Sequence, residues 1–404
     1  MPAVATGAVE FSGGWDGMRA FRERVWVSTV RILANGRARA APAPFVGYNR
    51  AMKIAQIAPP WITVPPAGYG GTEWVVKHLC DGLTAAGHEV VLFASGDSRT
   101  PAELRALFAQ PQTAMMALPS AMTSYDARHV SHAVGQIQAD GDFDVVHDHS
   151  GFLLVALRRF LDLPPVLHTV HCAFDTHAYP FYEQFHDAVA YASISDFQRT
   201  LGPPGMAWAG TVYNALPVAG WPLVTAKDDY LLAFGRVCED KGFHLAVEIA
   251  RRTGHRLVMA GVVQDWYRDY FEQRIAPEID GDLVVFEAEV TDERKRELFA
   301  HAKGFLFPIL WPEPFGLVMV EALATGTPVI ALRNGSVDEV VDDGVTGFVC
   351  DDVDQMVAAV ARLDEIDPHA CRRVVEERFT VAAMSAGYER LYRELVREVR
   401  PALP

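Results

Sequence analysis

The stretch that decides the fold is residues 53–94, KIAQIAPPWITVPPAGYGGTEWVVKHLCDGLTAAGHEVVLFA. Its first six residues, Lys53 to Ala58, form a short apolar run ended by two prolines, which is typical of a buried parallel strand. From Glu73 to Ala86 apolar residues recur at helical spacing, and Gly87 follows as a C-cap. Glu89 to Ala94 is a second apolar run. A strand, a helix and a strand in this order predict a right-handed unit with two parallel strands.

The same alternation continues along the chain. It predicts further strands at Phe143–His147, Pro165–Thr169 and Ala190–Ile194, while the stretch 97–142 is expected to carry loops and a helix. A second alternating series begins near residue 230. Its expected strands are Tyr230–Phe234, Arg256–Ala260, Leu283–Phe286, Gly304–Phe307 and Pro328–Ala331, and its expected helices are Phe243–Thr253, Trp266–Ile275, Arg294–Lys303, Gly316–Thr325 and Asp354–Asp364. Prolines and a glycine interrupt the pattern over 214–228, so we expect two doubly wound α/β domains whose strand ends face each other across a cleft.

Composition limits the class of protein. The 404 residues are 50% hydrophobic and 22% charged, with a formal net charge of −15, which argues against a nucleic-acid binder but leaves room for one small anion in a local basic pocket. No apolar run approaches the roughly 18 residues that span a bilayer. The five cysteines are scattered without a CxxC pair, which favours a reduced, cytoplasmic protein over a disulfide scaffold or a zinc module.

The first 51 residues differ from the rest. They contain seven arginines, no lysine and three acidic residues, and they lack sustained periodicity. The short apolar stretch Val25–Ala34 is a poor match to a secretory signal because acidic residues precede it. We expect a disordered N-terminal extension or translated upstream sequence, with an organelle transit peptide as the alternative.

The most informative motif is Pro312-Glu-Pro-Phe-Gly-Leu-Val-Met-Val-Glu321, which crosses the start of a predicted helix after a buried strand. Gly316 permits close approach of a ligand to the backbone, and the free N–H groups at the helix start favour an anion. Glu313 precedes the helix and Glu321 lies more than one turn inside it. The two carboxylates are therefore expected to hold two polyol groups on either side of a bound diphosphate, rather than to be a solvated loop acid and a surface helix acid.

A second motif, Gly235-Arg-Val-Cys-Glu-Asp-Lys-Gly242, follows the strand Tyr230–Phe234. Arg236 offers a planar donor fork and Lys241 a mobile point charge, and the two together suit a diphosphate. Taken alone this pattern is as often surface charge. Its place at the same sheet edge as Glu313 favours a binding role.

These two motifs, in this order, resemble the retaining glycosyltransferases of family 4 (glycosyltransferase group 1), which have the GT-B fold of two Rossmann-like domains. The resemblance covers nearly all of residues 52–395. The sequence also resembles that of the family at residues 70–73, 144–147, 169–171, 193–195, 212–214, 326–330, 335–339 and 343–347. Ser336 stands where the family often has glycine.

The resemblance implies a role for each matching residue. The catalytic set that it implies is Glu313, which would hydrogen-bond hydroxyls of the donor sugar, His171, which would contact that sugar from the first domain, and Arg236 and Lys241, which would neutralise the diphosphate. The donor-binding set that it implies consists of Gly70, Gly71, Phe315, Gly316, Leu317, Glu321 and Val290. Glu321 would bind the ribose, and the nucleobase would lie near 287–290. The implied domains are an extension (1–51), an acceptor-side domain (52–222), a donor-binding domain (223–384) and a C-terminal helix that crosses back (385–404).

The implied site residues also indicate a mechanism of sugar transfer. Fixed cations and amide donors would stabilise the charge that develops on the leaving diphosphate, so no metal and no cofactor beyond the nucleotide sugar are expected. The anomeric configuration would be retained, with the departing phosphate acting as the base in the mechanism usual for the family. We expect His147 and His149 to point to opposite faces of the sheet, which argues against a metal site. Gly68-Tyr-Gly-Gly-Thr-Glu73 lacks the third glycine of a dinucleotide fingerprint, which argues against a nicotinamide enzyme.

The expected function is therefore transfer of a sugar from a UDP-, GDP- or ADP-sugar to an acceptor hydroxyl. Two alternatives remain: nucleotide-sugar 2-epimerisation on the same fold, and a non-catalytic two-lobed protein that binds a sugar or a nucleotide. A glycan, a lipid and a small molecule all remain open as acceptors. We expect no nucleic-acid partner and no transmembrane segment, and a peripheral membrane contact stays open.

Deleting residues 1–51 is expected to leave the melting temperature and the activity nearly unchanged, because the composition of this segment does not support a packed core. Thermal unfolding and turnover of the full chain and of the shortened chain test this. A large drop in either quantity would show that the extension packs against the rest of the protein.

Overall fold

The computed structural model describes residues 50–68, 70–116 and 118–399. The extension that the sequence predicts over 1–51 lies outside these ranges except for its last two residues. In the described ranges, no helix is both long enough and apolar enough to cross a membrane.

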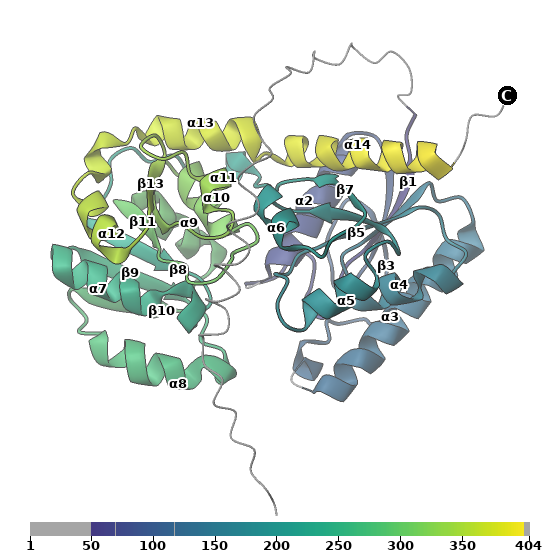
Figure 1. Ribbon diagram of the computed structural model, residues 1–404, viewed down its shortest axis with the longest axis horizontal. Coiled ribbons are helices and arrows are strands. Elements are labelled where there is room, and N and C mark those ends of the chain that lie inside the picture. Colours follow the sequence, from purple (N-terminus) through teal and green to yellow (C-terminus); the bar gives the residue numbers. More distant parts are fainter. Residues whose placement is uncertain (1–49, 69, 117, 400–404) are drawn as a thin grey trace, which may run out of the picture. The chain divides into compact units, whose positions relative to one another are not determined.

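The first sheet has seven parallel strands in the order β3-β2-β1-β4-β5-β6-β7 (Figure 1). They are β1 (Lys53–Ile57), β2 (Glu89–Phe93), β3 (Glu103–Arg105), β4 (Val145–Asp148), β5 (Val166–Thr169), β6 (Ala190–Ser193) and β7 (Trp208–Thr211). The helices of this part are α2 (Gly71–Ala85), α3 (Pro119–Asp140), α4 (Phe152–Leu157), α5 (Ala178–Gln184) and α6 (Asp196–Leu201). The strand order reverses beside β1, and ligands of such sheets bind beyond the carboxyl ends of the strands at this switch point.

The second sheet has six parallel strands in the order β10-β9-β8-β11-β12-β13, which repeats the same reversal beside β8. They are β8 (Tyr230–Phe234), β9 (Arg256–Gly261), β10 (Val284–Ala288), β11 (Gly304–Phe307), β12 (Val329–Leu332) and β13 (Gly347–Cys350). Its helices are α7 (Phe243–Thr253), α8 (Arg268–Tyr270), α9 (Asp292–His301), α10 (Leu317–Ala324), α11 (Val337–Val340), α12 (Val353–Val360) and α13 (Pro368–Arg378). The helix expected over Trp266–Ile275 is instead a 3-10 turn, the single turn α8 and a π-helical turn.

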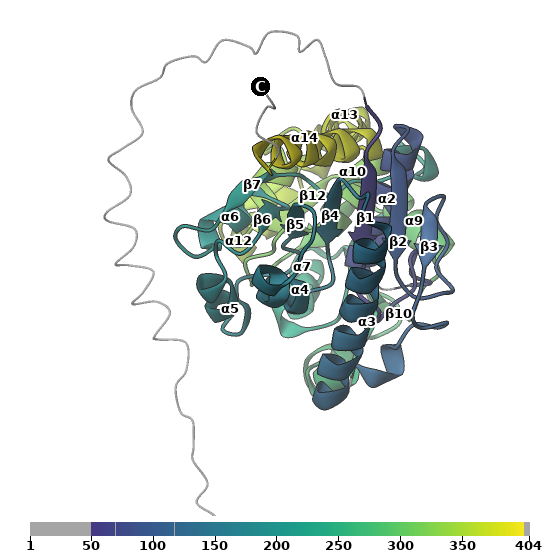
Figure 2. The ribbon, with the colours of Figure 1, turned by 90° about the vertical axis from the view of Figure 1, so that its right-hand side faces the viewer.

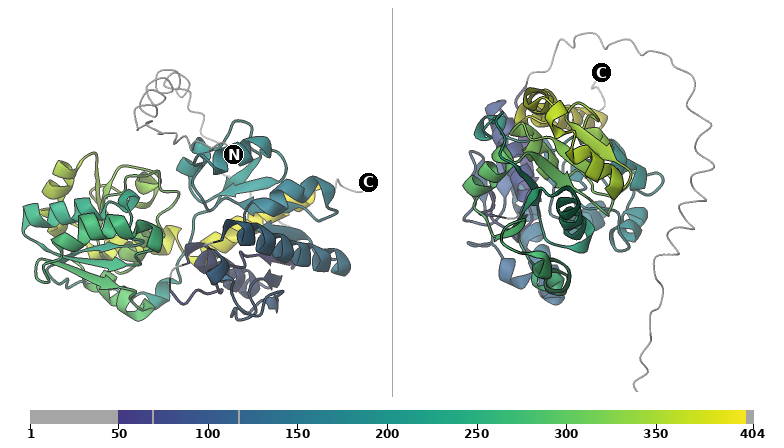
Figure 3. Two further views of the ribbon diagram at one scale, coloured as in Figure 1. Left: turned by 90° about the horizontal axis from the view of Figure 1, so that it is seen from below. Right: turned by 90° about the vertical axis from the view of Figure 1, so that its left-hand side faces the viewer.

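The last helix, α14 (Val381–Val399), packs on the first sheet. Its residues Met384, Tyr388, Leu391 and Tyr392 share a core cluster with β1, β2 and α2, whereas α3 belongs to the cluster on the other face. Figure 2 shows α14 and α3 on opposite sides of these strands. In Figure 3 (left), α14 is the yellow helix that lies along the part of the structure formed by the first sheet and its helices. The close approach of α14 to α2 needs a glycine, because a Cβ at Gly82 would lie 1.9 Å from Ser385 Oγ.

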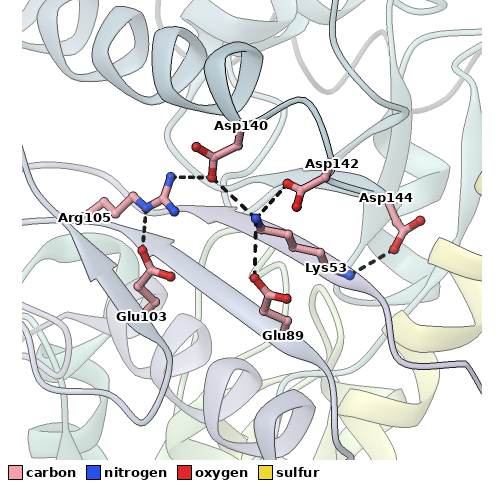
Figure 4. A network of polar contacts seen from close by, with 7 residues as sticks. All are labelled: Lys53, Glu89, Glu103, Arg105, Asp140, Asp142 and Asp144. Carbon is pink, nitrogen blue, oxygen red and sulfur yellow. Dashed lines mark hydrogen bonds and ion pairs between the residues drawn. The ribbon is translucent and has the colours of Figure 1, made fainter.

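An ion-pair network lies where β1 and β2 begin (Figure 4). Lys53 Nζ lies 2.7 Å from Asp142 Oδ1, 3.4 Å from Glu89 Oε1 and 3.5 Å from Asp140 Oδ2. Arg105 reaches the same Asp140 at 2.8 Å. The hydrogen bond to Asp142 and the other nearby carboxylates raise the pKa of Lys53. These charges tie the end of α3 to the amino-terminal edge of the sheet, away from the edge where ligands of such folds bind.

The loop between β11 and α10 is held by the segment after β12. Gly335 has φ +61°, and a Cβ there would lie 2.3 Å from the carbonyl oxygen and 2.5 Å from the nitrogen of Glu313. Ser336 N donates to the Glu313 carbonyl at 3.0 Å, and Ser336 Oγ donates to the Phe315 carbonyl at 2.7 Å. Backbone packing and two hydrogen bonds therefore set the position of Glu313.

Gly335→Ala is expected to destabilise the protein more than Gly344→Ala. Both glycines have positive φ, at +61° and +73°, but a Cβ at Gly344 would meet no atom within 4 Å. The left-handed backbone alone costs about 1–2 kcal/mol, and the clash with Glu313 adds about 1–3 kcal/mol at Gly335. Urea unfolding of the two variants measures the difference, and equal losses would show that Gly335 does not press on the Glu313 loop.

Candidate active site

A cavity of about 270 Å³ lies between loops that follow strands of both sheets. The first sheet contributes the start of α2, the segment after β5, and Asn214. The second contributes the loop after β8 and the loop between β11 and α10. The predicted site residues that line this cavity are Gly71, His171, Arg236, Lys241, Glu313, Phe315, Gly316 and Leu317.

Glu339 of α11 connects the two walls beside this cavity. Its carboxylate accepts the backbone N–H groups of Asp196 and Phe197, at 2.8 and 2.6 Å, in the first turn of α6. It also accepts the hydroxyl of Tyr213 at 3.0 Å. A carboxylate at the start of a helix is favoured by the unpaired N–H groups there, so this contact stabilises the packing of the second sheet's part against the first.

Lys241 and Glu313 form an ion pair in the cavity wall. Trp311 Nε1 donates to the same Glu313 oxygen, Oε2, at 2.9 Å, and Lys241 Nζ lies 5.2 Å from the centre of the Trp311 ring. Among the described residues, no hydrogen bond reaches Glu313 Oε1. The carboxylate is therefore oriented through one oxygen and has the other available to accept a ligand hydroxyl.

The start of α10 faces the same cavity. Gly316 is its N-cap with φ +74°, and a Cβ there would lie 2.6 Å from Met319 Cε. The first N–H groups of a helix have no carbonyl partner within it, and the helix dipole adds positive potential. The Phe315 side chain is 2% exposed and packs in the core of the second sheet, so at residues 315 and 316 only backbone is presented to a ligand.

Arg236 adds a second cation to the lining. It follows β8, and its guanidinium carbon lies 5.4 Å from the centre of the Tyr267 ring. Arg236, Lys241 and the start of α10 therefore all line this cavity.

Glu321 lies in a neighbouring cavity of about 30 Å³, and Leu317 lines both cavities. Glu321 is 4% exposed, its Oε1 pairs with Lys295, and its Oε2 is buried without a hydrogen-bond partner. Burial raises the pKa of Glu321, and the nearby Lys295 ammonium opposes this shift. A buried oxygen without a partner is costly unless a ligand satisfies it, so Glu321 fits a contact with ligand hydroxyls.

Two predicted site residues are not among the residues that line these cavities. Val290 packs against the core of the second sheet, and the neighbouring Glu287 pairs with Arg294 at 2.7 Å. Gly70 precedes the lining residue Gly71, and a Cβ at Gly70 would lie 2.7 Å from Pro66 Cβ. Tight packing against Pro66 accounts for a glycine at this position.

The predicted placement of His147 and His149 on opposite faces is wrong. Their ring centres are 3.9 Å apart, because residues two apart on a strand point to the same face. His149 Nδ1 lies 2.8 Å from Nε2 of His171. Within the described ranges, no three His, Cys, Asp or Glu side chains are placed to hold a metal ion.

Sequence reasoning missed three residues of the site. Trp311 orients Glu313, Lys295 pairs with Glu321, and Asn214 lines the larger cavity with its buried Oδ1 unpartnered. Trp311 lies two residues before Glu313 in the motif, which is a usable signal. The place of Lys295 follows only from how α9 and α10 pack.

Two models of known protein families match different parts of the chain. Residues 222–377 match the model of the glycosyl transferases group 1, and residues 69–200 match that of Glycosyltransferase Family 4. The chain is 27% identical over 361 residues to a glycogen synthase of Mycobacterium tuberculosis, covering 76% of this chain and 86% of that protein.

Two solved structures extend the comparison. AviGT4, a glycosyltransferase involved in avilamycin A biosynthesis, is 26% identical with a TM-score of 0.60, and the match covers 86% of this chain and 98% of AviGT4. HepE of Anabaena, solved with UDP-glucose, shares the fold at 16% identity and a TM-score of 0.62, over 85% of this chain and all (100%) of HepE. The protein is a glycosyltransferase with the GT-B fold, and it belongs to the group 1 glycosyltransferases of family 4.

Proposed function

We propose that this enzyme transfers a sugar from a nucleotide-diphosphate sugar to an acceptor hydroxyl, with retention of the anomeric configuration and without a metal ion. The observation that carries the proposal is the cavity in which Arg236, Lys241 and the start of α10 lie beside the Glu313 carboxylate. That combination suits a diphosphate attached to a sugar, since cations and amide donors bind the phosphates while a carboxylate accepts sugar hydroxyls.

Each end of the donor has a proposed contact. Glu313 Oε1 accepts a hydroxyl of the donor sugar, and His171 contacts that sugar from the first sheet's side. The unpartnered Oε2 of Glu321 accepts a ribose hydroxyl. Gly70 and Gly71 allow the loop before α2 to lie close to the phosphates and the acceptor, and the nucleobase lies towards Val290.

Donor binding changes the partner of Lys241. In the structure its ammonium is paired with Glu313. Phosphate oxygens compete for this ammonium, and sugar hydroxyls replace it at the carboxylate. As the glycosidic bond breaks, negative charge grows on the β-phosphate, so Arg236, Lys241 and the helix N–H groups bind the transition state more tightly than the ground state. These groups supply the positive field that a metal ion supplies elsewhere.

Retention follows in this proposal from the geometry of the leaving group. The departing phosphate accepts the proton of the acceptor hydroxyl on the same face of the sugar from which it leaves. The base is therefore the β-phosphate of the donor, and no side chain of the enzyme is assigned that role. The acceptor is a glycan, a lipid or a small metabolite.

Incubation with a panel of UDP-, GDP- and ADP-sugars, including UDP-glucose, tests the proposal. We expect one donor class to release free nucleoside diphosphate, to give a glycoside with the donor's anomeric configuration by NMR once an acceptor is supplied, and to do so in the presence of EDTA. Inversion of configuration would contradict the retaining mechanism. Loss of activity in EDTA, with recovery on adding metal, would contradict metal independence.

Glu313→Gln is expected to lower turnover at least tenfold with the fold intact, because an amide binds sugar hydroxyls and Lys241 less strongly than a carboxylate does. The matched control is Glu293→Gln, which changes an exposed acid on α9. Turnover with the best donor and thermal unfolding are measured for both variants. Normal turnover in Glu313→Gln would remove Glu313 from the site.

A further inference from the structure

A chain of buried polar side chains connects His171 to the C-terminal helix. His171 Nε2 lies 2.8 Å from His149 Nδ1, and His149 Nε2 lies 2.9 Å from Gln56 Oε1. Gln56 Nε2 donates to the hydroxyl of Tyr392, on α14, at 3.1 Å. Gln56 and Tyr392 are fully buried and His149 is 4% exposed. The chain therefore runs from the cavity, through β1, to the last helix of the protein.

The Gln56 amide presents its nitrogen to Tyr392, at the far end of this chain, and its oxygen to His149. The Tyr392 hydroxyl lies 2.6 Å from His147 Nδ1, and His147 Nε2 lies 2.7 Å from Thr169 Oγ1. Because the Gln56 amide nitrogen donates to the phenol oxygen, the phenol hydrogen is directed to His147 Nδ1. The amide oxygen of Gln56 consequently faces His149.

Proton positions along the chain follow from this orientation. An amide oxygen only accepts, so His149 Nε2 carries a proton. Burial holds the pKa of His149 well below its usual range, and the ring is therefore neutral with Nδ1 as an acceptor. His171 Nε2 must then be the donor. Burial lowers the pKa of His171 to about 3, so this ring is neutral too and its proton is on Nε2.

We propose that His149, Gln56 and Tyr392 are positioning residues that hold His171 as the Nε2–H tautomer, so that its Nδ1 is a hydrogen-bond acceptor for a hydroxyl of the donor sugar. Among the described residues, no hydrogen bond involves His171 Nδ1, and His171 lines the larger cavity. The acceptor role of Nδ1 rests on the proposed function, whereas the tautomer itself does not.

The choice of tautomer matters for recognition. A hydroxyl that donates to Nδ1 gains a hydrogen bond, while an N–H at the same position faces the hydroxyl oxygen instead and needs a different rotation of that group. Since Gln56, His149 and Tyr392 are buried, exchanging donor for acceptor at one end of the chain changes the preferred tautomer at the other. The hydrogen bond between Gln56 and Tyr392 of α14 thereby determines whether His171 presents an acceptor or a donor to a sugar hydroxyl.

The test uses two-bond ¹H–¹⁵N correlation spectra of the full chain with ¹⁵N-labelled histidine, in which the pattern of ring cross-peaks identifies the protonated nitrogen. The His171 signals are assigned by their loss in His171→Asn. We expect the wild type to show His171 protonated at Nε2. In Gln56→Met, His149 loses the acceptor for its Nε2–H, and we expect its proton to move to Nδ1 and that of His171 to move to Nδ1 as well.

Tyr392→Phe is the second variant. Without the hydroxyl the Gln56 amide is free to turn over, and we expect a mixture of His171 tautomers. Tyr191→Phe is the matched control, since Tyr191 is equally buried and its hydroxyl donates to the Phe185 carbonyl at 2.5 Å and to no member of this hydrogen-bonded chain. The control is expected to lose a similar amount of thermal stability and to keep the wild-type His171 pattern.

Two results would overturn the inference: a wild-type His171 protonated at Nδ1, or an unchanged His171 pattern in the folded variant. If Gln56→Met does not fold, Tyr392→Phe alone decides. The spectra need no substrate, so failure of the proposed function is seen separately, as absence of sugar transfer by the wild type. Where transfer occurs, Gln56→Met is expected to lower turnover at least tenfold while the affinity for nucleoside diphosphate, which lacks the sugar, stays unchanged.

Discussion

The close packing of the Gly335 backbone on the Glu313 loop is the constraint on which the site depends. No side chain fits between them, and Ser336 adds hydrogen bonds to Glu313 and Phe315. The burial of Phe315 in the core holds the loop further, and the first residues of α10 line the cavity. A buried strand and a buried helix thus hold a short polar loop where a diphosphate can meet it.

The chain uses the two edges of its first sheet differently. Lys53, at the start of β1, and Arg105, on the edge strand β3, bind carboxylates in a network that fastens the end of α3, and neither lines the cavity. At the carboxyl edge, the buried polar residues are arranged in a hydrogen-bonded chain that ends at His171. Because this series of hydrogen bonds begins on α14, the last helix of the protein contributes to the site through the first sheet. Its core residues also pack on that sheet.

Local pattern was sufficient for the alternating strands and helices, and the predicted bounds of Tyr230–Phe234 and Gly304–Phe307 agree with the structure. It was not sufficient for β3, which has three residues, or for β7, in which Gly210 interrupts the run. The lining of the cavity by Arg236, Lys241 and Glu313 was predictable, since parallel strands bring their following loops to one edge. The unpartnered oxygen of Glu321 and the contact between His149 and His171 depend on packing between distant segments, which a single sequence does not contain. The domain bounds stay predictions.

The most direct measurement is a crystal structure of the enzyme with the nucleoside diphosphate that it binds most tightly. The account predicts phosphate oxygens within hydrogen-bond distance of the N–H groups at Gly316 and Leu317 and of the Lys241 ammonium, with the ribose hydroxyls on Glu321. A nucleotide bound with its phosphates away from α10, or with Lys241 still paired to Glu313 and no contact to Arg236, would contradict it.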